Sequence, residues 1–134
     1  MTREELEKQW RDAVFTVETE HGTATFRENE TVGNGDVLPP CRSITVVTAF
    51  NPDGEVRSPA ENESAHQRLL DYLGDQGFHF TRANGAAADG SHEEKSVGVY
   101  DLTEDEARAL GAAFGQACVM YWDGARARLL WMQQ

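Results

Sequence analysis

Two asparagines flank a sharp turn near the middle of the chain, and their side chains could orient a ligand. Asn51 ends an apolar segment, Pro52-Asp53-Gly54 forms the turn, and Asn62 follows a few residues later. A side-chain amide can donate and accept hydrogen bonds, so two of them near one strand end could hold a small polar molecule. The alternative is that both amides brace the turn through hydrogen bonds to its backbone.

Three further polar residues lie at the predicted ends of other elements. Glu94 and Ser96 open a predicted strand after a glycine-containing loop, and Gln116 follows the glycine that ends a helix. A partly buried Glu94 could act as a general base, which makes it the one catalytic candidate. The alternatives are that Glu94 is an exposed acid or pairs with Arg82, and that Gln116 links backbone groups as a structural amide.

The segment after the turn is predicted to be a helix with a polar end on its inner face. Ser58 is the expected N-cap, and Glu61 completes a capping box. Helical spacing places Asn62 and His66 on the same face as two leucines, Leu69 and Leu73. Asn62 and His66 are therefore expected at the rim of the core or at the mouth of a pocket, and both are candidate ligand-binding residues.

The spacing of the other reactive residues does not predict a metal site or a known catalytic motif. The four histidines lack metal-ligand spacing, and consecutive residues of a strand at His92, Glu93 and Glu94 would point to alternate faces. No serine lies in a nucleophile-elbow context. Gly33-Asn34-Gly35 lacks the following helix of a dinucleotide-binding loop. We expect no metal and no cofactor.

The elements that must position these residues are expected in the order β-α-β-β-α-β. The predicted segments are residues 44–50, 58–76, 78–82, 96–101, 103–114 and 117–122, preceded by a helix at 2–12 and two strands at 13–19 and 23–29, and followed by a strand at 127–132. This is the ferredoxin-like order. We predict a single α+β domain over residues 1–134, with a mostly antiparallel sheet, helices packed on one face, a ferredoxin-like βαββαβ core at about 44–122 and extra strands at both ends.

Charge and composition narrow the classes of partner and the compartment. The chain has 134 residues, 12 Lys and Arg against 23 Asp and Glu, and a net charge of -11, which argues against nucleic-acid binding. The N-terminal sequence MTREELEKQW has no apolar signal region, and no apolar run is long enough for a membrane span. With only two cysteines, Cys41 and Cys118, we expect reduced thiols and a cytoplasmic location without membrane contact.

Four short segments together resemble a family of uncharacterised bacterial proteins, the domain of unknown function 3293 (DUF3293). They are TAFNP, ENESAHQRLL, HEEKSVGV and LGAAFGQACV, and the likeness extends over about residues 12–132. Two positions depart from the family pattern, since Lys95 replaces a proline and Ala117 replaces an asparagine. The resemblance implies no activity, but it directs attention to a set of polar and turn residues: Asn51, Pro52, Glu61, Asn62, Glu94, Ser96 and Gln116.

Two functions from different classes remain open on these residues. The first is small-molecule binding at a polar pocket near Asn51 and Asn62, with His66, Ser96 and Gln116 as further ligand-binding candidates. The second is a non-enzymatic interaction or regulatory protein that binds a protein partner through its acidic surface or through the final hairpin, which contains Trp122 and Trp131.

Overall fold

The computed structural model describes residues 2–132, except for the side chains of Arg3, Leu6 and Gln9. The helices are α1 (Arg3–Arg11), α2 (Pro59–Asp75) and α3 (Glu104–Ala113). The strands are β1 (Val14–Thr19), β2 (Gly22–Phe26), β3 (Ile44–Val47), β4 (Phe80–Ala86), β5 (Glu93–Tyr100), β6 (Cys118–Trp122) and β7 (Ala127–Trp131). These elements confirm the prediction of a mixed α+β domain.

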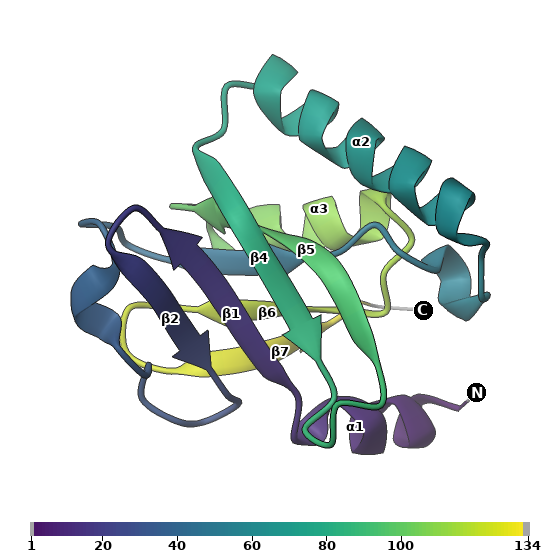
Figure 1. Cartoon of the computed structure of the whole chain (residues 1–134), viewed down its shortest axis with the longest axis horizontal. Coiled ribbons are helices and arrows are strands. Elements are labelled where there is room, and N and C mark those ends of the chain that lie inside the picture. The colour runs from purple at the N-terminus through teal and green to yellow at the C-terminus, as the bar shows by residue number, and fades with distance from the viewer. Residues whose placement is uncertain (1, 133–134) are drawn as a thin grey trace.

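The strands form one sheet in the order β2-β1-β4-β5-β3-β6-β7, and every neighbouring pair is antiparallel. The strands outside the segment from β3 to β6 join the sheet at its two sides, as the sequence predicted. The sheet curls so strongly that its two sides meet. The contact is a hydrogen bond from the Asn29 amide, just after β2, to the Ala127 carbonyl oxygen of β7 at 2.8 Å. One face of the sheet is therefore concave and closes on itself (Figure 1).

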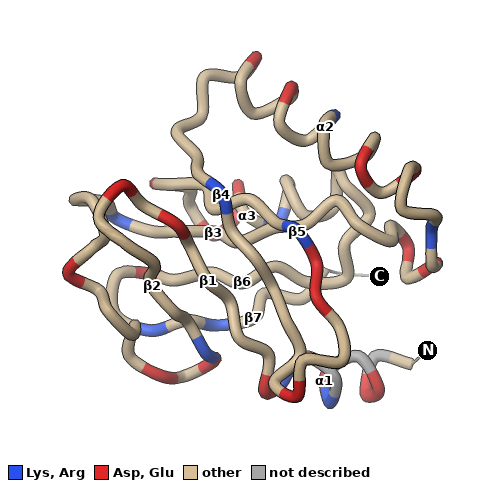
Figure 2. The backbone as a smooth tube through the Cα atoms, in the orientation of Figure 1, with Lys and Arg blue, Asp and Glu red and all other residues tan. Residues whose placement is uncertain are grey.

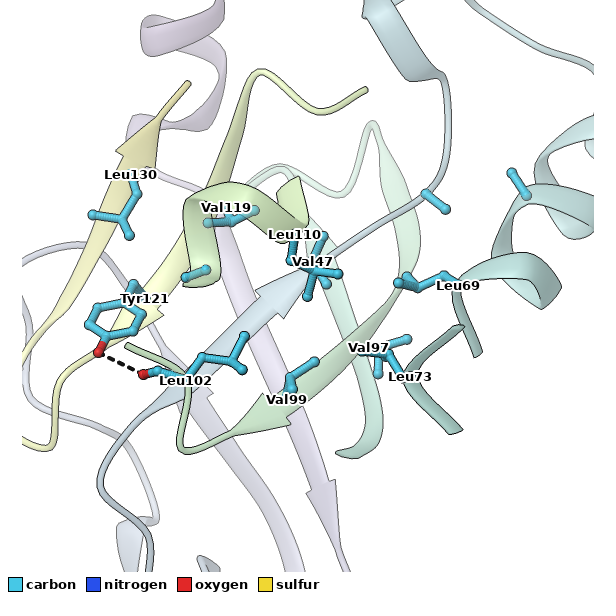
Figure 3. Packing of buried hydrophobic residues seen from close by; sticks show 13 residues of the cluster. Val47, Leu69, Leu73, Val97, Val99, Leu102, Leu110, Val119, Tyr121 and Leu130 are labelled. Carbon is cyan, nitrogen blue, oxygen red and sulfur yellow. Dashed lines mark hydrogen bonds between the residues drawn. The ribbon is translucent and has the colours of Figure 1, made fainter. Parts of the chain in front are cut away.

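The other face of the sheet is covered by α2 and α3 (Figure 1). Leu69 and Leu73 of α2 and Leu110 of α3 pack with strand residues such as Val97 in one buried cluster (Figure 3). At the edge of this cluster the Tyr121 hydroxyl donates to the Leu102 carbonyl oxygen at 3.0 Å. Burial of this apolar surface holds both helices on the sheet.

A second apolar cluster fills the concave face. It contains strand residues from both sides of the sheet, including Phe15, Phe26 and Met120, and Trp10 of α1 packs against it. The prediction that the helices share one face is therefore right for α2 and α3 and wrong for α1. The physical reason is that the curl leaves one end of the concave cluster open, and an aromatic side chain from α1 packs there.

Both long helices begin where the sequence predicted. Ser58 and Thr103 are the N-caps of α2 and α3, and each forms a reciprocal capping box with a glutamate, Glu61 or Glu106. A capping box satisfies amide groups that the first helical turn leaves without partners. The start of α2 is thereby placed close to the turn that follows β3.

Four predicted strand boundaries are wrong by three residues or more, and two of them change the position of site residues. β2 ends at Phe26 and not at residue 29. β3 ends at Val47 and not at residue 50, while β4 continues to Ala86 and β5 begins at Glu93. Pairing with β1 on one side and β5 on the other extends β4 through a glycine- and alanine-rich segment that resembles a loop. Glu94 and Ser96 consequently lie within β5, and the connecting loop is only residues 87–92.

Within residues 2–132, no helix combines the length and the apolar character that crossing a membrane requires.

Candidate functional site

An open cleft of about 690 Å³ lies at one end of the curled sheet. The C-terminal ends of β3, β4 and β7 meet the N-terminal ends of β1, β5 and β6 there, because all neighbouring strands are antiparallel. α1, the turn after β3 and the end of α3 complete the walls. The mouth of a barrel-like sheet is a common position for a small-molecule site.

The alternation of side chains along β5 directs Glu94 and Ser96 into this cleft. They are 6% and 4% exposed, while the intervening Lys95 points to the opposite face and pairs with Glu63 of α2, with Nζ and Oε1 2.7 Å apart. Gly85 of β4 lies opposite Glu94 in the sheet register. A side chain at Gly85 would crowd the ring of Phe15, since its Cβ would lie 3.3 Å from the Cε1 atom.

The Glu94 carboxylate accepts hydrogen bonds from two neighbouring residues. His92 Nε2 lies 2.9 Å from Oε2, and Asn51 Nδ2 donates to the same oxygen at 3.4 Å. The imidazole of His92 is half-buried, and the edge of its ring faces Trp10 at a centroid distance of 6.3 Å. Glu94 is thus neither exposed nor paired with Arg82, the two alternatives considered from the sequence.

Asn51 connects three segments through its backbone and side chain. Its backbone amide donates to Asn62 Oδ1 at 2.9 Å, and its own Oδ1 accepts from Asn62 Nδ2 at 3.0 Å and from the Arg57 amide at 2.9 Å. Asn51 adopts a left-handed conformation (φ 48°), which asparagine tolerates better than most residues. These bonds brace the turn against α2, as the structural alternative predicted, and they also direct the Asn51 amino group at Glu94.

Gln116 joins the end of α3 to the turn after β3. Its Nε2 donates to the carbonyl oxygens of Phe50 and Phe114, each at 3.1 Å. The adjacent Gly115 accepts a hydrogen bond from the Asp53 amide at 2.8 Å, and a Cβ on this glycine would come within 2.8 Å of Pro52 Cβ. The amide of Gln116 therefore acts as a link between two cleft walls.

His66 and Asn62 lie on the buried side of α2, behind the cleft wall, and do not line the cleft. The His66 ring meets Phe50 edge to face at a centroid distance of 6.4 Å, and its buried Nδ1 has no hydrogen-bond partner among the described residues. Burial lowers the pKa of His66, and the nearby Lys95 ammonium lowers it further. His66 is a rim residue of the core whose ring supports a cleft-lining aromatic.

Four of the predicted site residues line the same cleft: Asn51, Glu94, Ser96 and Gln116. The sequence interpretation missed His92 as a partner of Glu94. The available signal was their spacing of two residues, which places both side chains on the same side of an extended segment. It also missed Trp10 and Trp131, which reach the cleft from the two ends of the chain and could be assigned only once the curl was known.

The described side chains contain no group of three or more His, Cys, Asp or Glu that could hold a metal ion. The chemistry that the cleft does offer comes from a buried carboxylate, an imidazole and an amide amino group that meet at one oxygen atom. Such a set can accept a hydrogen bond or a proton from a bound molecule.

Comparison with protein families gave one match. A model described as "Protein of unknown function (DUF3293)" matches residues 47–119, which is more than half of the chain. The chain therefore belongs to this family, as the four sequence segments indicated, although the match is shorter than the predicted 12–132. No curated protein and no solved structure matched.

Proposed function

We propose that this member of the DUF3293 family binds a small molecule in the cleft at the open end of its curled sheet. The observation that carries the proposal is the position of Glu94, a buried carboxylate in the wall of a cleft of about 690 Å³. Burying a charge costs free energy, so a carboxylate held there with space in front of it is better explained by a ligand than by folding.

In this proposal some residues of the site contact the ligand directly, and others hold those residues in position. Glu94 and His92 face the cleft with polar atoms, and Ser96 lies beside them in the floor. Asn51 holds the carboxylate in place, while Asn62 and Gln116 hold the turn that carries Asn51. In this proposal Glu94 accepts a hydrogen bond or a proton, and the amides that suggested a site in the sequence act mainly as its support.

Two finer predictions belong to the same proposal. The order β6-β3-β5-β4 within the sheet supports a ferredoxin-like core, because the first strand of that core then lies between the fourth and the third. Cys41 is a free thiol, which supports a cytoplasmic location.

The alternative of a protein partner recognised through the acidic surface has less support. The acidic positions are spread over loops, α2 and β5, with Lys and Arg among them, instead of gathering on one element (Figure 2). Neutralising the acidic residues on one face of the protein is therefore not expected to abolish the binding of a partner.

A thermal-shift screen with a chemically broad set of metabolites tests the cleft as the binding site. Ala117 is exposed at the cleft wall, so Ala117→Phe places a ring in the cleft without entering the core, while Ala113→Phe puts the same ring on α3 outside it. A true ligand raises the melting temperature of the wild type and of Ala113→Phe by mass action, and raises that of Ala117→Phe much less. Equal shifts in all three proteins, or no stabilising compound at all, would contradict the proposal.

A further inference from the structure

The Glu94 carboxylate belongs to the cleft lining, and only one of its two oxygens accepts hydrogen bonds from the described residues. Among the described residues, both hydrogen bonds to this carboxylate end on Oε2, from His92 and from Asn51. A carboxylate oxygen can accept two hydrogen bonds, so Oε1 offers acceptor positions to a donor that enters the cleft. The ligand group that meets it must be a hydrogen-bond donor.

The charged residues that line the cleft indicate which kind of ligand group can donate to Glu94. The described residues that line it include two carboxylates, Glu94 and Asp53, and neither Lys nor Arg. A neutral His92 can donate Nε2–H to Glu94 without cancelling the negative charge. The nearby ammonium of Lys95 points to the other face of the sheet and is held by Glu63. An anionic ligand would meet uncompensated like charge here, whereas a cation would be attracted.

Aromatic rings from several elements line the same cleft as the Glu94 carboxylate. Trp10, Phe15, Phe50 and Trp131 all contribute to its lining, together with the exposed Val56 at the mouth. Aromatic and aliphatic walls bind the apolar body of a ligand, and aromatic faces also attract a cation. Gly85, which lies opposite Glu94 in the sheet register, has no side chain and so lets the Phe15 ring lie close against β4.

We infer that the ligand of this cleft is a small organic cation, an ammonium or amidinium group on an apolar body, whose charged group pairs with Glu94. This inference rests on the proposed function and names the chemical class of the molecule that it requires. The cation donates to Oε1, and its apolar part lies against the rings of Trp10 and Phe15. The same pairing explains why the carboxylate is buried beside a cleft, since the ligand supplies a permanent positive charge where the lining has neither Lys nor Arg.

Three probes of similar size and different charge test the inference in the intact protein. They are 2-phenylethylamine, a cation at neutral pH, 2-phenylethanol, which is neutral, and 3-phenylpropionate, which is an anion. Isothermal titration calorimetry at millimolar ligand concentration should give an affinity for the amine at least about tenfold above that for the alcohol, and no measurable binding of the acid. Equal binding of all three probes, tightest binding of the acid, or no binding of the amine overturns the inference.

Two neighbouring glutamates on β5 provide a matched pair of variants. Glu94→Gln removes the charge in the cleft with little change of shape, and Glu93→Gln removes a charge from the exposed opposite side of the same strand. The amine should lose at least about tenfold in affinity in Glu94→Gln and keep it in Glu93→Gln. Equal losses in the two variants would overturn the pairing with Glu94, and if Glu94→Gln does not fold, the ranking of the three probes on the wild type decides.

The outcomes also separate this inference from the proposed function. If a neutral or anionic compound stabilises the wild type but not Ala117→Phe, the cleft is a binding site and the cation assignment is wrong. If no compound of any charge distinguishes Ala117→Phe from Ala113→Phe, the proposed function fails as well.

Discussion

Replacing Asn62 by alanine should destabilise the fold by about 2.5 kcal/mol, although this side chain does not line the cleft. Asn62 is 7% exposed and makes two hydrogen bonds to Asn51, at 2.9 Å and 3.0 Å. Each such bond contributes about 1 kcal/mol net, and the backbone N–H of Asn51 would be left without its acceptor at a further cost of about 1 kcal/mol. The higher helix propensity of alanine offsets about 0.5 kcal/mol of this loss.

Urea denaturation of the wild type and two variants measures the effect. Gln67→Ala is the matched control, because Gln67 lies on the same helix and its amide bonds to Asp71 at 2.9 Å on the exposed surface. Its free energy of unfolding should stay within about 0.5 kcal/mol of the wild type. A loss in Asn62→Ala no larger than that in Gln67→Ala would refute the reasoning that the amide pair braces the turn. Faster hydrogen exchange at the Arg57 amide, which donates to Asn51 Oδ1, is the expected local sign of the loss.

Three other perturbations have outcomes that the structure determines. Gly115→Ala should lower the free energy of unfolding more than Gly77→Ala in urea denaturation, because both glycines have positive φ but only Gly115 would bring a Cβ into contact with Pro52; equal losses would contradict this. The free energy of unfolding should fall as the pH drops below 6.5, because the pKa of His66 is lowered in the fold and the unfolded chain therefore binds more protons in that range. Unfolding measured at several pH values should show a weaker pH dependence of stability in His66→Gln than in the wild type. An unchanged profile would assign the loss to other groups. Ser58→Ala should lower the unfolding free energy by about 1 kcal/mol through loss of the α2 cap, and a change within about 0.2 kcal/mol would show that the cap is dispensable.

The features that the sequence predicted best depend on local physical chemistry. The capping boxes at Ser58 and Thr103 marked the starts of two helices, because a cap involves residues only three positions apart. The length of β4 was missed because its second half, ANGA, has little intrinsic preference for a strand. That half is held in an extended conformation by pairing with β1, which is distant in sequence, and with β5, which follows later in the chain.

Several residues that line the cleft were predicted from the sequence, but the contacts that they make were not. The polar residues at element ends, Asn51, Glu94 and Gln116, were identified from type and position, and all three line the same cleft. The partners that come from other segments, such as Asn62 for Asn51 and Phe50 for Gln116, could not be read from the sequence. His92, two residues from Glu94, is the exception. The closure of the sheet through Asn29 and Ala127 is equally non-local, and it determines that aromatic residues from both ends of the chain reach the cleft.

The antiparallel order of the sheet explains why four separated segments of the family pattern come together at one end of the sheet. The TAFNP segment leaves β3, the HEEKSVGV segment enters β5 and the LGAAFGQACV segment enters β6 at the same end of the sheet, because β3 is antiparallel to both neighbours. The ENESAHQRLL segment, in the first half of α2, reaches that end through the bonds between Asn62 and Asn51. Within β5, Lys95 ties the strand to α2 while Glu94 and Ser96 face the cleft. In the proposed function one short segment therefore serves helix packing on one face and ligand contact on the other, so substitutions at adjacent positions of β5 should separate stability from binding.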